Sequence, residues 1–336
     1  MAEKDITARD LVHHADVFAD IVNGSIFVLT GKWPSPLVQP EDLVDAPTRS
    51  VSISGDEIHG QERDVVKFWT AGETVLCLMG LENQTRVDPD MAFRVFSYEG
   101  ADYRRQLAER DAEVKDRRKV RRQGKRKKPY PVLTIVLYFG TKRPWPKNKL
   151  ALLDLFPDLG EPLRSLLNNC RVNVIELARL TAEQAAVFKS DFSIVVDYLR
   201  QTCQDKEFVP SDQMIVHVEE TVRFLSALTG DRGLVENLPN FKQRGVPMTV
   251  RNFFGEAREE GIQIGEARGE ARGIQIGEAR GETRGIQIGE ARGRVNMLIS
   301  LVSDGSLPLA VAAKKANMSE DEFKTRICEQ EEAGKS

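Results

Sequence analysis

The chain has 336 residues, of which 41% are hydrophobic and 29% charged, and its formal net charge is −3. This composition is typical of a soluble globular protein, and the length predicts two or three domains. Apolar runs such as Val75–Leu81 and Val132–Phe139 are far shorter than the roughly 20 residues that span a bilayer, so no membrane partner is expected. The four cysteines are far apart and form no CxxC pair. They therefore predict neither a disulfide framework nor a zinc site, and they favour a cytoplasmic location.

Residues 1–145 mix helical and strand patterns in a definite order. Alternating residues indicate a half-buried strand, and a continuous apolar run indicates a strand buried on both faces. Asp88 and Pro89 suit the start of a helix, as N-cap and first helical residue. The predicted elements are a helix over Ile6–Ile21, strands over Asp64–Trp69 and Val75–Leu81, a helix from Asp88 to about Leu107, and a strand over Tyr130–Phe139. This order predicts an α/β domain.

The rest of the chain divides into three regions with different sequence patterns. Residues 146–250 show helical apolar spacing and are predicted to form a helical domain. Residues 255–294 are a glycine-rich repeat, in which GIQIGEARGEAR recurs with small changes. Residues 295–336 are predicted to form a small helical segment, in which Ser319 and Glu322 make a capping box. A helix-turn-helix and a protein contact are both open for this segment.

The repeat places glycine at every fourth residue from Gly261 to Gly293. As a helix it would carry separate ridges of Glu and Arg, because residues two apart on a helix do not face each other. Such a helix could pair with a second copy of the chain in a homo-dimer, acidic ridge against basic ridge. Each glycine lowers intrinsic helicity by about 1 kcal/mol. A flexible linker is therefore the alternative.

Two acidic residues lie at the ends of the paired strands: Asp64 begins the first and Glu82 ends the second. Strand side chains alternate, so Glu82 and Gln84 share a face. A three-residue loop centred on Gly72 would pair Asp64 with Gly80, bring it to that face, and leave roughly 7–8 Å between the Cα atoms of Asp64 and Glu82. Two such carboxylates can share Mg²⁺, with Mn²⁺ as a substitute, and so support phosphodiester hydrolysis. The alternative is that both are strand-end residues facing solvent.

Short motifs with a fixed order and spacing run from about residue 10 to about residue 235. They are Phe18–Gly24, Pro40–Leu43, Arg63–Val66, Leu81–Gln84, Met91–Tyr98, Pro131–Gly140, Pro144–Trp145, Asn173–Leu177, Phe188–Tyr198 and Phe224–Gly230. Together they resemble the Rpn family of recombination-promoting nucleases, also described as transposases. The resemblance implies an α/β fold with a PD-(D/E)XK restriction-endonuclease-like core over residues 1–145, followed by a helical region. It also implies a metal-dependent endonuclease that acts on double-stranded DNA in recombination or transposition.

The resemblance assigns roles residue by residue. Asp64 resembles the family's first metal-binding aspartate, and Glu82 resembles the acidic residue of its (D/E)xK element. Gln84 stands where most PD-(D/E)XK nucleases have lysine; glutamine is usual there in Rpn-like chains, but a neutral amide supplies no positive charge. Arg94, on the next predicted helix, either supplies that charge or forms a structural salt bridge. Asp20, on the first predicted helix, is either an accessory metal ligand or a solvated helix residue.

A basic run occupies residues 115–128, between the second predicted helix and the strand that follows. It holds ten Lys or Arg residues and one Asp. Such a run suits phosphate contacts, which give salt-sensitive affinity that does not depend on base sequence. The residues assigned to DNA binding are Arg117, Arg118, Lys119, Arg121, Arg122, Lys125, Arg126, Lys127 and Lys128. The alternative is a solvated loop.

A DNA endonuclease is therefore the leading hypothesis, and two others stay open. Gln84 in place of lysine motivates a catalytically weak DNA-binding protein that keeps the nuclease fold. The repeat motivates a self-assembling scaffold or regulatory protein. Metal-dependent nicking of DNA separates the first hypothesis from the other two.

Overall fold

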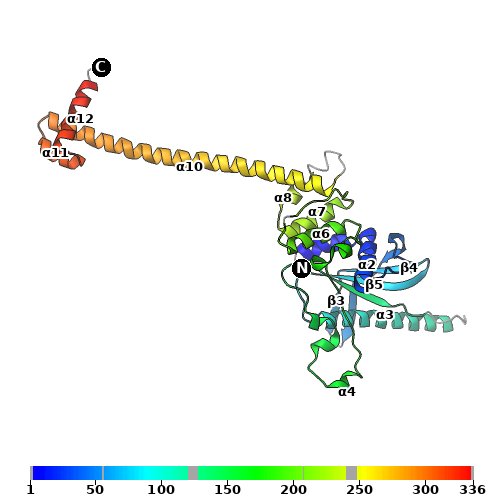
Figure 1. Cartoon of the computed structure of the whole chain (residues 1–336). Coiled ribbons are helices and arrows are strands. Elements are labelled where there is room, and N and C mark those ends of the chain that lie inside the picture. The colour runs from blue at the N-terminus through cyan, green and yellow to red at the C-terminus, as the bar shows by residue number, and fades with distance from the viewer. Residues whose placement is uncertain (1–2, 55–56, 120–127, 207, 240–247, 334–336) are drawn as a thin grey trace. The chain divides into compact units, whose positions relative to one another are not determined.

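The computed structural model describes the chain except for residues 1–2, 55–56, 120–127, 207, 240–247 and 334–336. The chain divides into two compact units, Met1–Arg258 and Glu259–Ser336, and each is described by itself (Figure 1). Within the described residues, no helix is both long enough and apolar enough to cross a membrane.

The first unit is an α/β structure, as the sequence predicts. Its described strands are β1 (Leu43–Asp45), β2 (Arg49–Ser54), β3 (Glu57–Glu62), β4 (Val65–Ala71), β5 (Thr74–Gln84), β6 (Val132–Tyr138) and β7 (Asn173–Glu176). Its described helices before residue 250 are α1 (Glu3–Val12), α2 (Ala15–Thr30), α3 (Met91–Lys119), α4 (Glu161–Arg164), α5 (Ala182–Ala185), α6 (Phe192–Cys203), α7 (Val218–Thr229) and α8 (Gly233–Glu236).

A mixed five-stranded sheet organises this unit, in the order β1-β4-β5-β6-β7. The β1–β4 and β4–β5 pairs are antiparallel, whereas the β5–β6 and β6–β7 pairs are parallel. Parallel neighbours need a long crossover connection, and α3 supplies it between β5 and β6. β2 and β3 form a separate two-stranded hairpin.

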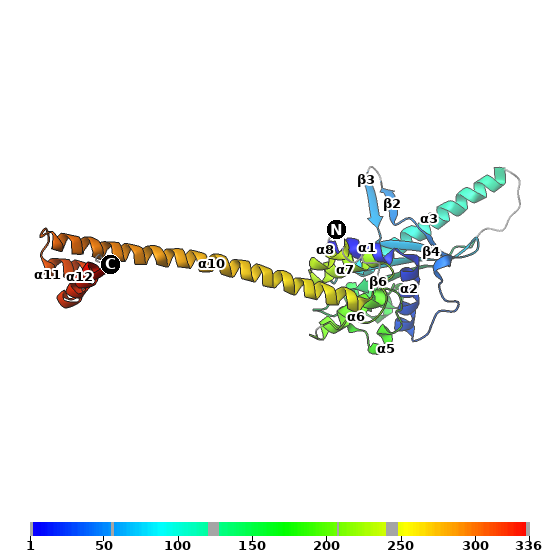
Figure 2. The ribbon, with the colours of Figure 1, turned by 90° about the horizontal axis from the view of Figure 1, so that it is seen from above.

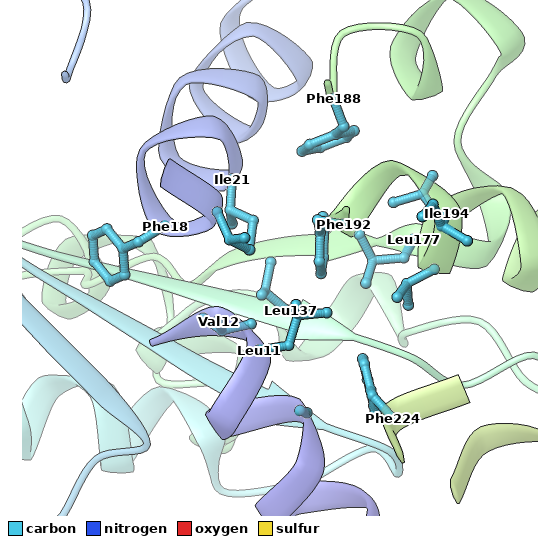
Figure 3. Close-up of a cluster of buried hydrophobic side chains, with 14 of the residues drawn as sticks. Leu11, Val12, Phe18, Ile21, Leu137, Leu177, Phe188, Phe192, Ile194 and Phe224 are labelled. Carbon is cyan, nitrogen blue, oxygen red and sulfur yellow. The ribbon is translucent and has the colours of Figure 1, made fainter. Parts of the chain in front are cut away.

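One face of the sheet carries the main hydrophobic core. Leu137 of β6 is fully buried there against helical side chains such as Leu11 of α1, Phe18 of α2 and Phe192 of α6 (Figure 3). Leu81 of β5 is fully buried in the same cluster. Burial of such aliphatic and aromatic side chains contributes about 1.5–3 kcal/mol each. The helices that supply them come from both ends of the unit's sequence, so this core joins its N-terminal and C-terminal parts.

The opposite face of β6 packs against α3. Met91, Ala92 and Val95 of α3 are buried with Val136 and Tyr138 of β6 in a second, smaller cluster. Because helices cover both faces, the central strands are buried on both sides. The continuous apolar run predicted to be such a strand is therefore confirmed.

The N-terminal helix was predicted as one element over Ile6–Ile21, and this is wrong. The chain forms α1 and α2 instead, with extended backbone at His14 (φ −61°, ψ 133°) between them. Both helices bury apolar residues at helical spacing, such as Leu11 and Phe18. The apolar pattern continues through the break, so it could not reveal that the chain forms two helices there. The second predicted helix also differs, since α3 extends to Lys119 rather than ending near Leu107.

The boundary predicted at residue 145 does not separate two compact units. Residues 146–250 contribute β7, which pairs with β6 over Ile135–Tyr138 and completes the sheet of the first unit. The described part of this region is therefore not a separate helical domain. The strand was missed because β7 has only four residues, too few to show a period against the helical spacing around it.

The second unit contains most of α10 (Val250–Ser303), with α11 (Leu309–Ala316) and α12 (Glu320–Ala333). The glycine-rich repeat is helical here, the first of its two alternatives. The capping box is confirmed: the Ser319 amide donates to a Glu322 carboxylate oxygen at 2.8 Å, and the Glu322 amide donates to Ser319 Oγ at 3.2 Å. Phe323 is fully buried against Ile299 and Ala312, which gives the three helices a small core.

Candidate functional site

The turn between β4 and β5 sets the register of the two acidic residues. The expected three-residue loop and the pairing of Asp64 with Gly80 are both wrong. Ala71 pairs with Thr74, which leaves a two-residue loop in which Gly72 adopts a φ of +59°, a conformation that glycine tolerates. A β-bulge then shifts the register between Trp69 and Thr70. Beyond the bulge, Val66 pairs with Gly80 and Val65 with Leu81.

β4 begins at Val65, and Asp64 is the bend residue just before it, so the register ends one residue short of Asp64. The Asp64 carboxylate nevertheless lies near Glu82, because its charge raises the pKa of Glu82. A hydrogen bond of 2.7 Å from the Asn83 amide to Asp64 Oδ2 fixes the Asp64 carboxylate against β5.

Burial and charge repulsion both disfavour ionisation of the Asp64 and Glu82 carboxylates. Glu82 is only 1% exposed, and Asp64 is half-buried. Burial first, and the neighbouring Asp64 carboxylate second, raise the pKa of Glu82 from its ordinary 4.5 to about 8. Burial also raises the pKa of Asp64, although the Asn83 amide and the positive charges of Arg94 and Arg9 act against it. Ionising two close carboxylates together costs free energy. A cation bound between them would lower that cost.

Arg94 on α3 binds Glu82 directly. Its Nη2 lies 3.3 Å from Glu82 Oε2, its Nη1 donates to Asp88 Oδ2 at 2.7 Å, and its Nη2 also donates to the Tyr98 hydroxyl at 3.0 Å. Burial disfavours its charge, but the hydrogen bonds to Asp88 and Tyr98 outweigh this and raise the pKa of Arg94 above its ordinary value. Arg94 therefore forms salt bridges with Glu82 and Asp88, which is the structural alternative of the two given for this residue.

The pair has the chemistry to hold a hard divalent cation. Glu82 Oε1 is buried and lacks a hydrogen-bond partner within the described residues, although a buried carboxylate oxygen is costly to leave unpaired. Mg²⁺ is commonly held by one or two carboxylates, with water and substrate phosphates as its other ligands. Across the described parts of the chain, no cluster of three or more His, Cys, Asp or Glu residues is placed to hold a metal.

Asp20, predicted as an accessory metal ligand, serves a different purpose. Its Oδ2 accepts hydrogen bonds from the amides of Lys189 and Ser190 and from the Ser190 hydroxyl, at 2.7–2.8 Å. This carboxylate fixes the turn before α6, and the metal assignment is not supported. Burial raises the pKa of Asp20, against the effect of these hydrogen bonds. The hydrogen-bond partners of Asp20 lie about 170 residues later in the sequence, so its role could not be predicted from its neighbours.

Gln84 lies on the same face of β5 as Glu82, two residues further on, and is partly buried. Its backbone carbonyl accepts a hydrogen bond from the Phe139 amide at 2.8 Å, which holds the end of β5 beside the end of β6. The side-chain amide is therefore placed at the carboxyl end of the central strands, next to the carboxylate pair.

A pocket of about 530 Å³ opens beside Asp64. Its walls come from α1, α7 and the segment before β2, and include Arg9, His13, Thr48 and Arg223. Asp64 is thus reachable by a ligand as well as buried against β5. The ring of His14 stacks on that of His217 with 3.7 Å between centroids.

The sequence did not identify Asn83 and Tyr98 as parts of this site. The Asn83 amide orients Asp64, and Tyr98 orients Arg94 from one helical turn further along α3. The four-residue spacing of Arg94 and Tyr98 on a predicted helix was a usable signal for their contact. Asp88 was interpreted only as a helix cap, but its carboxylate also pairs with Arg94.

The basic run falls partly outside the described residues. Arg117, Arg118 and Lys119 are the last three residues of α3. Lys128 is exposed and lines a second pocket, of about 560 Å³, with Arg110 and Tyr130. Arg121, Arg122, Lys125, Arg126 and Lys127 lie outside the described residues. The run thus begins on the helix that carries Arg94.

Comparisons with known proteins do not place the chain in a family. No family model, no curated protein and no solved structure matches it. The chemistry of the site is therefore inferred from its own residues.

Proposed function

We propose that this protein is a metal-dependent DNA endonuclease that hydrolyses phosphodiester bonds on a PD-(D/E)XK-type core. The observation that carries the proposal is the proximity of the Asp64 and Glu82 carboxylates, with a buried Glu82 oxygen left without a partner in the described residues. The Rpn-like motifs and the basic run favour double-stranded DNA as the substrate, and recombination or transposition as the setting.

Each residue at the site has a part in this function. Asp64 and Glu82 would hold Mg²⁺ or Mn²⁺, which when bound supplies positive charge to the phosphate and makes water a better nucleophile. Gln84 would orient water through its amide. Arg94, which contacts Glu82, would supply the positive charge that lysine supplies in most PD-(D/E)XK nucleases. The pocket that Asp64 lines would give a phosphate access to that carboxylate.

Incubation of supercoiled plasmid with the full-length protein tests the proposal, in parallel samples containing Mg²⁺, Mn²⁺ or EDTA. We expect nicked or linear plasmid with either metal and unchanged plasmid with EDTA. Salt-sensitive binding without cutting in either metal would instead select the catalytically weak DNA-binding protein. Cutting that persists in EDTA would remove the metal from the proposal.

The basic run should supply a large share of the DNA affinity. Replacing Arg117, Arg118, Arg121 and Arg122 by serine is expected to weaken binding and to flatten its dependence on salt. Each lost phosphate contact lowers the slope of log affinity against log salt by about 0.9. Fluorescence anisotropy with a labelled duplex at several salt concentrations measures this slope. An unchanged slope would show that the run is a solvated loop.

A further inference from the structure

A single helix connects the carboxylate pair to the basic run. Arg94, which contacts Glu82, lies near the start of α3, and Arg117, Arg118 and Lys119 are its last three residues. Arg117 follows Arg94 by 23 residues, and Lys119 follows it by 25. At 1.5 Å per residue, these positions lie about 35–38 Å from Arg94 along the helix axis. The geometry of one continuous helix sets this separation.

The first half of α3 is held firmly in the first unit. Asp102 is fully buried and forms an ion pair with the buried Arg63, which lies just before β4. Gly80 of β5 lies under Arg63: a Cβ atom there would come 3.0 Å from Arg63 Nη1. The buried Gln106 amide donates to the Tyr130 carbonyl at 3.1 Å and accepts from the Tyr130 amide at 2.9 Å. These contacts fix α3 relative to β4, β5 and the carboxylate pair.

Arg110 still lines a pocket with Phe68 and Tyr130, and beyond it the helix leaves the body of the unit. Asp111 and Ala112 are exposed. This part of α3 extends past the sheet in both views of the ribbon (Figures 1 and 2). Glu109 and Asp111 carry negative charge on this stretch, so positive charge gathers at the end of the helix rather than along all of it.

The separation matches one turn of duplex DNA. B-DNA repeats every 34–36 Å or so, about 10–10.5 base pairs, and the same face of the backbone returns after each turn. We propose that the end of α3 contacts phosphates about one helical turn from the phosphate that is cut, so that the protein requires roughly 10 base pairs of duplex on one side of its site. This inference rests on the proposed nuclease function.

Binding to duplexes of two lengths tests this footprint. Duplexes of about 8 and about 16 base pairs lie below and above the proposed reach. With EDTA present to prevent cutting, the wild-type protein is expected to bind the longer duplex at least about tenfold more tightly. Its salt slope should also be steeper by about 2.7, which corresponds to three phosphate contacts. We call this gain in affinity and salt slope between the two duplexes the length step. Single-stranded DNA of the longer length should not show it.

Two triple variants separate the end of α3 from general charge effects. Arg117→Gln, Arg118→Gln and Lys119→Gln together should remove the length step, because glutamine keeps helix propensity without the charge. Lys314→Gln, Lys315→Gln and Lys324→Gln remove the same charge from exposed positions of the second unit and should keep the step. The footprint would be overturned if the wild-type protein lacks the length step. It would also be overturned if the α3 triple variant retains the step.

The footprint and the nuclease activity fail in different ways. A length step without plasmid cutting in Mg²⁺ or Mn²⁺ would leave the footprint intact and overturn the catalytic proposal. Metal-dependent cutting by a protein that binds the short and long duplexes equally would do the reverse. Circular dichroism of each variant verifies that a lost step does not reflect an unfolded protein.

Discussion

Replacing Asp64 by asparagine or Glu82 by glutamine is expected to lower Mg²⁺-dependent cutting of plasmid by at least about 100-fold. Loss of groups that merely orient metal ligands already costs about 10–100-fold, and these two residues would be the ligands themselves. Each substitution keeps the side-chain shape and removes one negative charge from the buried pair. Duplex affinity in EDTA should stay within about twofold of wild type, because the basic run lies elsewhere. Initial cutting rates and anisotropy titrations measure the two effects separately.

The control for this experiment is Glu183→Gln. Glu183 is an exposed residue of α5, so its substitution removes the same charge away from the pair and should leave cutting unchanged. An Asp64→Asn or Glu82→Gln protein that cuts at the wild-type rate would show that the metal site has been assigned to the wrong residues.

The stability of the metal-free protein is expected to fall as the pH rises from about 5 to about 8. The pKa of Glu82 is raised from 4.5 to about 8 by burial and by Asp64, so the folded state holds a proton there that the unfolded state releases. Stability from this group is complete below pH 4.5 and is lost as the pH rises through the folded-state pKa. The cost of ionising Glu82 in the fold is on the order of a few kcal/mol. Denaturant unfolding in EDTA across this pH range measures the effect.

Glu82→Gln should remove most of this pH dependence, since glutamine does not titrate. Its midpoint at pH 8 should exceed that of wild type, whereas Glu183→Gln should follow the wild-type curve. Mg²⁺ favours the ionised carboxylate, so the rise in melting temperature that it causes in wild type should grow with pH and vanish in Glu82→Gln. Identical pH profiles for wild type and Glu82→Gln would contradict the burial and repulsion assigned to this group.

Much of the local structure is encoded in short stretches of sequence. The apolar run that forms β5, the alternation that forms β4 and the capping box at Ser319 depend on neighbours within a few residues. Strand alternation also determined that Glu82 and Gln84 share a face. The approximate positions of the two carboxylates at the strand ends could therefore be predicted.

The strand register that ends just before Asp64 and leaves it near Glu82 was decided by tertiary structure. A one-residue bulge is enough to move a side chain to the other face, and nothing in the spacing from Gly72 to Glu82 specifies it. The break at His14 was also decided by tertiary structure, because α1 and α2 follow one apolar period. At the break, His217 stacks on His14 and hydrogen-bonds to Asp16, and His217 lies about 200 residues away in the sequence.

The role of an acidic side chain also depended on residues far away in the sequence. Asp20 and Asp64 are both aspartates beside apolar residues. In the fold, Ser190 hydrogen-bonds to the carboxylate of Asp20, whereas the carboxylate of Asp64 lies near Glu82. Sequence by itself determined which residue types were present, and where strands and helices carry them. Only the tertiary structure decided which carboxylates are desolvated next to one another, because burial and repulsion depend on how distant segments pack.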